Sequence, residues 1–241
     1  MPLCISERTF VFRNHKPINI MGGIRSSLAR KYAMALSGLF LVVFLLQHFI
    51  INFTSVFSED IFNSWSHFMG NNFIVQAIFQ PILIFGVVFH FVFGFILEFR
   101  NRNSRNIKYV KYNGQANSSW MSRNMFYSGL VVLAFLGLHF YDFWIPEIVH
   151  KYIESHPEDS FRYYGETVAK FANDPIRTGL YVLSFVFLSL HLWHGFSSSF
   201  QSLGVKHNYM GKLKHFNWAK AFAVLIPAGF VFIALFHYFN N

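Results

Sequence analysis

The chain has 241 residues, of which 54% are hydrophobic and only 13% are charged, against about 25% charged residues in an average soluble domain. Its single cysteine, Cys4, excludes a disulfide framework, a thiolate zinc site and an iron–sulfur cluster built by this chain alone. The formal net charge of +9 comes from basic residues between apolar blocks, so it indicates membrane orientation and not nucleic-acid binding.

Five apolar blocks follow one another, each with about the 20 residues that an α-helix needs to cross a bilayer. They cover roughly residues 33–57, 73–99, 121–145, 176–203 and 218–239. Pro81, in the second block, removes one backbone donor and predicts a kink there. We therefore predict an all-α integral membrane bundle of five transmembrane helices over residues 31–241, preceded by a partly disordered cytoplasmic tail, residues 1–30.

Basic residues alternate between the two sides of this predicted bundle. Lys and Arg gather in the tail and in the connections after the second and fourth blocks, whereas the first connection has none and the third is rich in acids. The positive-inside rule then places the N-terminus in the cytoplasm and the C-terminus outside. The third connection, about residues 146–175, is long for a connection between helices.

Five histidines lie well inside the predicted spans, and four of the five spans carry at least one. They are His48, His90, His139, His191 and His194. An imidazole in hydrocarbon is costly and marks a functional site by default, although a single one also serves as a hydrogen-bonding contact between helices. Their repetition on four helices favours a shared functional role.

Depth in the membrane sorts these histidines into two levels. The first and third spans run outward, and His48 and His139 lie near their outer ends, whereas His90 and His194 lie at a similar distance from the inner ends of the second and fourth spans. At the rise of an α-helix, the levels are roughly 10–15 Å apart. We therefore expect an outer pair, His48 with His139, and an inner pair, His90 with His194.

Two neutral imidazoles that face each other across a bundle suit the two axial positions of a haem iron. An iron with both positions filled transfers electrons and does not bind substrate. Zinc needs more protein ligands, usually with a thiolate or carboxylate, and a di-iron centre needs several Glu residues. The sequence thus predicts two haems b with His48, His90, His139 and His194 as iron ligands.

Several neighbouring residues have more than one interpretation. His191 lies three residues before His194 and faces nearly the same way; we favour His194 as the ligand because Gly195 gives a macrocycle room, and His191 then bonds a propionate or another helix. Asp142 either reaches the interface as a snorkelling or capping residue, or handles protons for a quinone. Arg123 and Lys206 are candidates for haem-propionate contacts.

The chain resembles the single-chain dihaem cytochrome b anchor of bacterial succinate:menaquinone oxidoreductases and quinol:fumarate reductases over about residues 30–240. Four segments carry the likeness: SGLFLVVFLLQHF, FGVVFHFVFGFILEFR, GLVVLAFLGLHFYDFW and HLWHGFSSSFQSLGVKH. The last is the most specific, and it is closer to the succinate dehydrogenase branch. The family's ligands fall on His48 and His139 for the distal haem and on His90 and His194 for the proximal haem.

The resemblance implies an enzyme only as a subunit of respiratory complex II, which belongs to the tricarboxylic acid cycle and the electron-transport chain. A flavoprotein subunit with FAD and an iron–sulfur subunit dock on the cytoplasmic face of a multi-pass anchor in the bacterial cytoplasmic (inner) membrane. Electrons pass from succinate through these subunits and both haems to menaquinone, the substrate on the anchor's side. The partners are thus these two subunits, membrane lipid and menaquinone, with no succinate site in this chain.

The sequence departs from some fumarate reductases of the family at two positions. Leu192 stands where they carry a glutamate, and Asn63 lies near the place of an acidic quinol-site residue. Both differences weaken the alternative of a quinol:fumarate reductase anchor and leave the quinone site unassigned. A cytochrome b subunit of another respiratory dehydrogenase is a further alternative, as is a transporter or structural membrane protein with intramembrane histidines.

Overall fold

A computed structural model of the chain describes residues 26–103, 120–154, 162–204 and 218–240. Within these ranges almost every residue is helical and there is no strand. Five helices are long and apolar enough to cross a membrane, so the predicted all-α fold with five membrane-spanning helices is confirmed. They are Ser27–Thr54, Val75–Asn103, Met125–Tyr152, Pro175–Ser202 and Trp218–Phe239.

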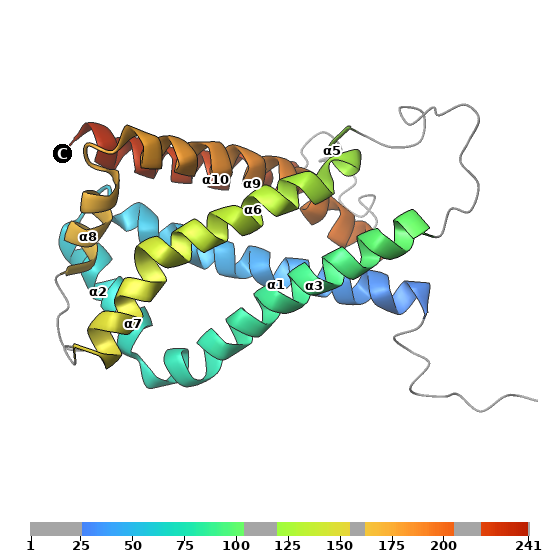
Figure 1. The fold of residues 1–241 in the computed structure, drawn as a ribbon, viewed down its shortest axis with the longest axis horizontal. Coiled ribbons are helices and arrows are strands. Elements are labelled where there is room, and N and C mark those ends of the chain that lie inside the picture. Colours follow the sequence, from blue (N-terminus) through green and yellow to red (C-terminus); the bar gives the residue numbers. More distant parts are fainter. Residues whose placement is uncertain (1–25, 104–119, 155–161, 205–217, 241) are drawn as a thin grey trace, which may run out of the picture.

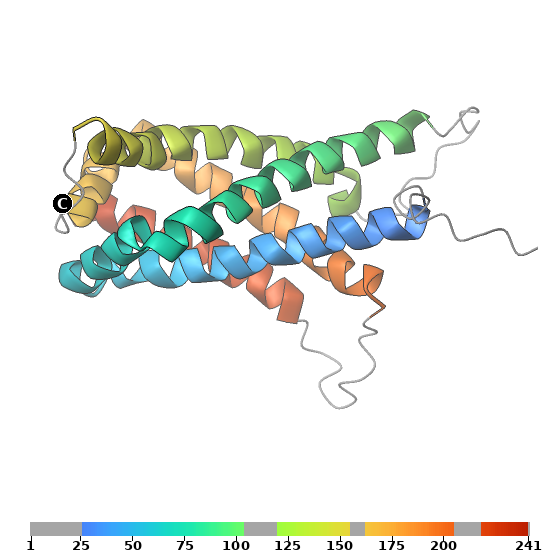
Figure 2. The ribbon, with the colours of Figure 1, turned by 90° about the horizontal axis from the view of Figure 1, so that it is seen from below.

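These spans run lengthwise through the molecule (Figures 1 and 2). The first is α1 (Ser27–Thr54) and the second comprises η2 (Val75–Phe79) and α3 (Gln80–Asn103). The third comprises α6 (Met125–His139), η3 (Phe140–Trp144) and α7 (Ile145–Tyr152), and the last two are α9 (Pro175–Ser202) and α10 (Trp218–Phe239). Helix α9 lies at the centre of the packing, because it contacts α10, α6 and α1.

The closest packing in the bundle is between α9 and α10. Ala219 and Ala223, four residues apart on α10, are buried, and so is Ala234 further along the same helix. Small side chains at this spacing let two helix backbones approach closely, which is how helices associate in lipid, where water no longer drives apolar contacts. The stacked rings of Phe185 and Phe230, with centroids 5.3 Å apart, fill the same seam.

The first helix begins earlier than its apolar block. Ser26 caps α1 by accepting a hydrogen bond of 3.0 Å from the backbone N–H of Ala29, a common way to satisfy the free donors of a helix start. The helix therefore starts at Ser27 and not near residue 33. Residues 27–30 belong to α1 and not to the predicted tail, and residues 1–25 lie outside the described ranges.

Two spans contain a turn of π-helix. In the second span, η2 comes directly before Gln80 and Pro81, so the disturbance predicted at Pro81 takes the form of a π-turn in the preceding residues. In the third span, η3 follows His139 and contains Asp142. Pro146 lies in the first turn of α7, where its missing N–H costs nothing, so this span continues to Tyr152 and does not end near residue 145.

Two short helices, α2 (Glu59–Asn71) and α8 (Arg162–Phe171), cover one end of the bundle, where the chain also ends (Figure 1). Helix α2 is capped by Ser58, whose side chain accepts from the N–H of Ile61. Helix α8 packs on α2, α10 and α9. The third connection is therefore largely helical in its described part, and α8 covers this end of the bundle.

Close contact between α1 and α10 gives a test of this packing. A Cβ added at Gly229 would clash with the ring of Phe49, so the Gly229→Ala variant must displace that ring. We expect a loss of about 1–3 kcal/mol in the free energy of unfolding. A Cβ at Gly179 in α9 would meet no atom within 4 Å. Gly179→Ala is therefore the matched control, and equal thermal stability of the two variants in detergent would contradict this packing.

Candidate functional site

The structure brings His48 and His139 together, as the depth argument predicts. His48 lies in the second half of α1, and His139 is the last residue of α6. Their ring centroids are 5.7 Å apart and their planes are nearly perpendicular, at 87°. Side chains that are far apart in sequence thus form one pair between two helices, and we call it the outer pair.

Aromatic rings enclose the outer pair. Phe44 stacks on His48 with centroids 5.6 Å apart, and Phe143 lies 5.2 Å from His139. Phe230 also contacts His48, and Phe135 and Tyr181 also contact His139. Such an apolar surrounding excludes water and suits a flat aromatic cofactor better than a hydrated ion.

A second pair, His90 with His191, joins α3 to α9, and we call it the inner pair in place of the predicted His90 with His194. The rings of His90 and His191 have centroids 6.4 Å apart. Each has a hydroxyl neighbour, since Ser37 Oγ lies 2.9 Å from Nδ1 of His90 and Ser128 Oγ lies 3.4 Å from Nδ1 of His191. This level therefore also brings together two histidines from different helices.

The member of the inner pair on α9 differs from the one favoured by the sequence. His194 Nε2 lies 3.1 Å from the hydroxyl of Ser198 on its own helix, whereas the ring of His191 contacts His90. The contact with His90 thus favours His191, and the motif resemblance favours His194. Which of the two would bind a metal stays a prediction.

Glycines allow close approach at the inner pair. A Cβ at Gly38 would lie 3.5 Å from Cε1 of His90, and a Cβ at Gly129 would lie 3.4 Å from Cε1 of His191. The second distance is at the short limit of ordinary contacts, so a larger residue at 129 would press on the imidazole. The two glycines thus leave room for the rings on both sides of this level.

Contacts along two helices fix the separation of the levels. On α1, Ser37 contacts His90, and His48 lies 11 residues later, which is about 16 Å along a helix. On α6, the hydroxyl of Ser128 contacts His191, and His139 lies 11 residues later, which is also about 16 Å. The two helices agree, and the value lies just above the separation expected from the sequence.

The two pairs suit some metal centres and not others. Within the described ranges, no group of three or more His, Cys, Asp or Glu side chains comes together to hold a metal ion. Zinc takes three or four protein ligands, whereas two imidazoles on opposite sides of one metal have ring centroids about 6 Å apart, given bonds of about 2 Å. The observed separations are 5.7 and 6.4 Å, and a metal held by either pair would need its other ligands from a cofactor such as a porphyrin.

Asp142 neither reaches the interface nor caps a helix end. It is only 1% exposed and accepts a hydrogen bond of 2.9 Å from the hydroxyl of Tyr181. The guanidinium of Arg177, with Nε at 3.6 Å, neutralises it. The snorkelling or capping interpretation is therefore wrong, because α9 supplies Asp142 with a buried donor and a counter-ion.

Sequence reasoning missed both partners of Asp142. The sequence did offer a signal for Arg177. It is a basic residue at the start of the fourth span, and few basic residues lie on that side of the predicted bundle. The turn before it, Asn173-Asp174-Pro175, fixes its place, since Asp174 accepts from the N–H of Arg177 at 2.8 Å. Nothing in the local sequence links Tyr181 to Asp142.

The described residues include only one of the two predicted propionate contacts. Arg123 is the last residue of the short helix α5 (Trp120–Arg123), at the end of the bundle away from α8 (Figure 1). Lys206 lies outside the described residues, as does Cys4. The proposed role of Arg123 and Lys206 thus stays a prediction.

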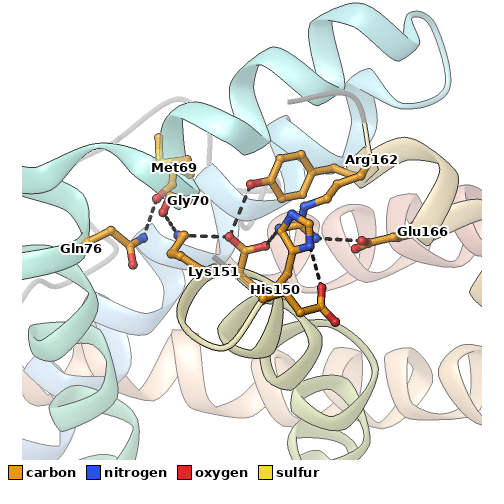
Figure 3. A network of polar contacts seen from close by, with 10 residues as sticks. Met69, Gly70, Gln76, His150, Lys151, Arg162 and Glu166 are labelled. Atoms are coloured by element: carbon orange, nitrogen blue, oxygen red, sulfur yellow. Dashed lines mark hydrogen bonds and ion pairs between the residues drawn. The ribbon is translucent and has the colours of Figure 1, made fainter. Parts of the chain in front are cut away.

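A polar network joins α2, α7 and α8 at the covered end of the bundle (Figure 3). Its centre is Glu147, which pairs with Arg162 and, at 3.1 Å, with Lys151. Lys151 also donates to the carbonyl of Gly70 at the end of α2, and Arg162 pairs with Glu166 at 2.8 Å. We call this set the cap network, because it ties both short helices to the third span.

Tyr163 adds a neutral donor to the cap network. Burial, together with the adjacent Glu147 carboxylate, raises the pKa of Tyr163 to about 12. The hydroxyl is therefore protonated at neutral pH and donates to Glu147 at 3.4 Å.

A buried polar cluster beneath α8 was also missed. His237 is 0% exposed and lies 2.9 Å from the hydroxyl of Ser55. Asn63 accepts from the N–H of Tyr164 at 2.8 Å, and the Tyr164 ring lies 5.6 Å from His237.

Helix α2, which carries Asn63, also had a signal in the sequence. Ser58 comes directly before Glu59 and Asp60, and a capping residue followed by acidic residues predicts a helix start.

Comparisons of the chain with models of known protein families, with curated proteins and with solved structures find no match. The resemblance to dihaem cytochromes b thus stays a prediction from the four segments that carry it. Any assignment of activity depends on the residues and contacts described above.

The cap network gives a stability test. Glu147→Gln leaves Arg162 and Lys151 without their shared carboxylate in a setting where Glu147 is only 19% exposed, so we expect a loss of about 1–3 kcal/mol. Hydrogen exchange of the α8 amides measures it. Glu154→Gln is the control, since Glu154 is 54% exposed and its loss should cost less than about 0.5 kcal/mol. Equal exchange in both variants would show that the network does not hold α8.

Proposed function

We propose that this chain is a dihaem cytochrome b that anchors a succinate dehydrogenase in the membrane and passes electrons to menaquinone. The observation that carries the proposal is the arrangement of histidines in two pairs on four membrane-spanning helices, about 16 Å apart along the bundle. The four sequence segments that resemble such anchors add the link to succinate.

Each pair of histidines would bind one haem. His48 and His139 would hold the outer haem, and His90 with His194 or His191 would hold the inner one. A haem b with two axial imidazoles supplies one-electron transfer. The surrounding phenylalanines exclude water, and Gly38 and Gly129 keep the imidazoles of the inner level free of larger neighbours.

The proposed reaction requires partners, because this chain lacks cluster ligands. Oxidation of succinate to fumarate releases two electrons and two protons in a flavoprotein with FAD, and an iron–sulfur protein delivers the electrons to the anchor. Reduction of menaquinone to menaquinol consumes two electrons and two protons. The basic end of the bundle, with Arg100, Arg102 and Arg123, would face the cytoplasm in a bacterial inner membrane and receive these subunits.

The alternative functions differ in the residues that they would need in this chain. A quinol:fumarate reductase anchor would run the same haems in the opposite direction, but Leu192 and Asn63 replace acids found in some of that branch. Cytochromes b of other respiratory dehydrogenases often take two ligands from one helix, whereas the two observed pairs involve α1, α3, α6 and α9. A transporter or structural membrane protein would bind no haem.

The first test of the proposal is spectroscopic. The purified protein should show b-type bands on reduction with dithionite, and pyridine haemochromogen analysis should give two haems per chain. His48→Ala should remove one haem and His90→Ala the other, because each deletes one axial ligand at a different level. Absence of b-type bands would exclude every haem function, and loss of the same haem in both variants would refute the pairing.

The same measurement decides the second inner ligand. Either His191 or His194 is the second axial ligand of the inner haem in this proposal. Replacement of that residue by alanine should remove the inner haem, and the same replacement of the other histidine should keep it. His67→Ala is a control for the loss of an imidazole on α2, outside both pairs, and should keep two haems.

The link to succinate needs a separate test. Affinity purification of the tagged chain from its native membrane should recover stoichiometric FAD-containing and iron–sulfur subunits, and the complex should reduce menaquinone with succinate. These partners are expected because the chain itself carries neither a cluster nor a visible FAD-binding fingerprint. Recovery of a different dehydrogenase with an intact dihaem spectrum would favour the cytochrome b of another respiratory complex.

A further inference from the structure

Asp142 places a carboxyl group in the interior of the bundle, and only one of its two oxygens has a partner among the described residues. Oδ2 accepts from Tyr181 and faces Arg177. Oδ1 is buried and has no hydrogen-bond partner among the described residues. A buried carboxylate oxygen without a hydrogen-bond donor costs free energy. We therefore expect a donor for Oδ1.

The outer pair contains a possible hydrogen-bond donor for Oδ1 of Asp142, namely Nδ1 of His139. Nδ1 of His139 is also buried and also has no hydrogen-bond partner among the described residues. An imidazole that binds a metal through Nε2 carries its proton on Nδ1, and that N–H almost always has an acceptor. His139 thus lacks an acceptor where Asp142 lacks a donor.

The fold holds these two groups near each other. Asp142 follows His139 by three residues, in the π-turn η3 that directly continues α6. Tyr181 of α9 touches both, since its hydroxyl bonds Asp142 and its ring centroid lies 6.4 Å from that of His139. The interaction of Tyr181 and Arg177 with Oδ2 leaves Oδ1 as the available acceptor.

We propose that Asp142 is a positioning residue for the outer pair, and that its Oδ1 accepts the Nδ1–H of His139 directly or through one ordered water. This proposal rests on the proposed function, in which His139 binds iron. The carboxylate fixes the orientation of the imidazole and makes it a stronger electron donor, which stabilises the ferric state of the outer haem.

The other histidines of the two pairs have weaker neighbours. His90 and His191 lie beside the hydroxyls of Ser37 and Ser128, and Asn52 lies beside His48. Among the four histidines of the two pairs, only His139 has a carboxylate three residues away in its own span. The proposal therefore predicts a difference between the two haems that arises from one residue.

The test is Asp142→Asn in the full chain with both haems bound. We expect two haems per chain, a higher midpoint potential for the haem that His48→Ala removes, and an altered highest g value in its ferric low-spin EPR signal. The inner haem should keep its potential and its signal. Asp142→Glu, which restores the carboxylate, should return both readouts part of the way.

The matched control is Asp174→Asn. Asp174 faces the same arginine, with its Oδ2 3.9 Å from Nε of Arg177, and asparagine preserves its capping of α9. This variant should leave both haems unchanged. A raised potential with an unchanged EPR signal in Asp142→Asn would indicate a charge effect at a distance and would overturn the positioning role.

A second variant keeps the proposal testable if Asp142→Asn does not fold. Tyr181→Phe removes the hydroxyl that holds Oδ2 but keeps the ring beside His139, so it should change the potential and the EPR signal of the outer haem and leave the inner haem unchanged. No shift in a folded Tyr181→Phe with two haems would contradict the proposal. Absence of haem from the wild-type chain would instead refute the proposed function.

Discussion

The seam between α9 and α10 is the constraint on which the other arrangements depend. Small residues of α10, Ala219 and Ala223, bring the two helices together, and α9 then contacts α6 and α1 as well. In lipid such close packing replaces the hydrophobic effect as the force between helices. Because α9 carries His191, Tyr181 and Arg177, the rotation of this one helix sets which side chains face the outer and the inner pair.

The two histidine levels share helices but differ in their surroundings. Helix α1 contributes His48 to the outer pair and Ser37 to the neighbourhood of the inner one, so one rigid element fixes their spacing. Aromatic rings and a neutralised carboxylate lie near the outer pair, whereas hydroxyls and glycines lie near the inner pair. One bundle thus offers two chemically distinct places for the same kind of group.

The sequence predicted what depends on length and depth and missed what depends on contacts between helices. Apolar blocks of spanning length predicted the five helices, and depth alone paired His48 with His139. Helix α2 was missed because a short amphipathic segment lacks the length signal. The neighbour of His90 was missed because His191 and His194 both face inward, and the burial of Asp142 was missed because its partners lie on another helix.

Helix α3 is held differently from the rest of the bundle. Its main neighbour is α1, none of its most apolar stretch is buried, and yet it supplies His90. Separation of α3 from α1 would leave the seam of α9 and α10 intact, and few buried contacts oppose such a local opening. Any group bound between His90 and a side chain of α9 would therefore tie this most exposed span to the rest of the bundle.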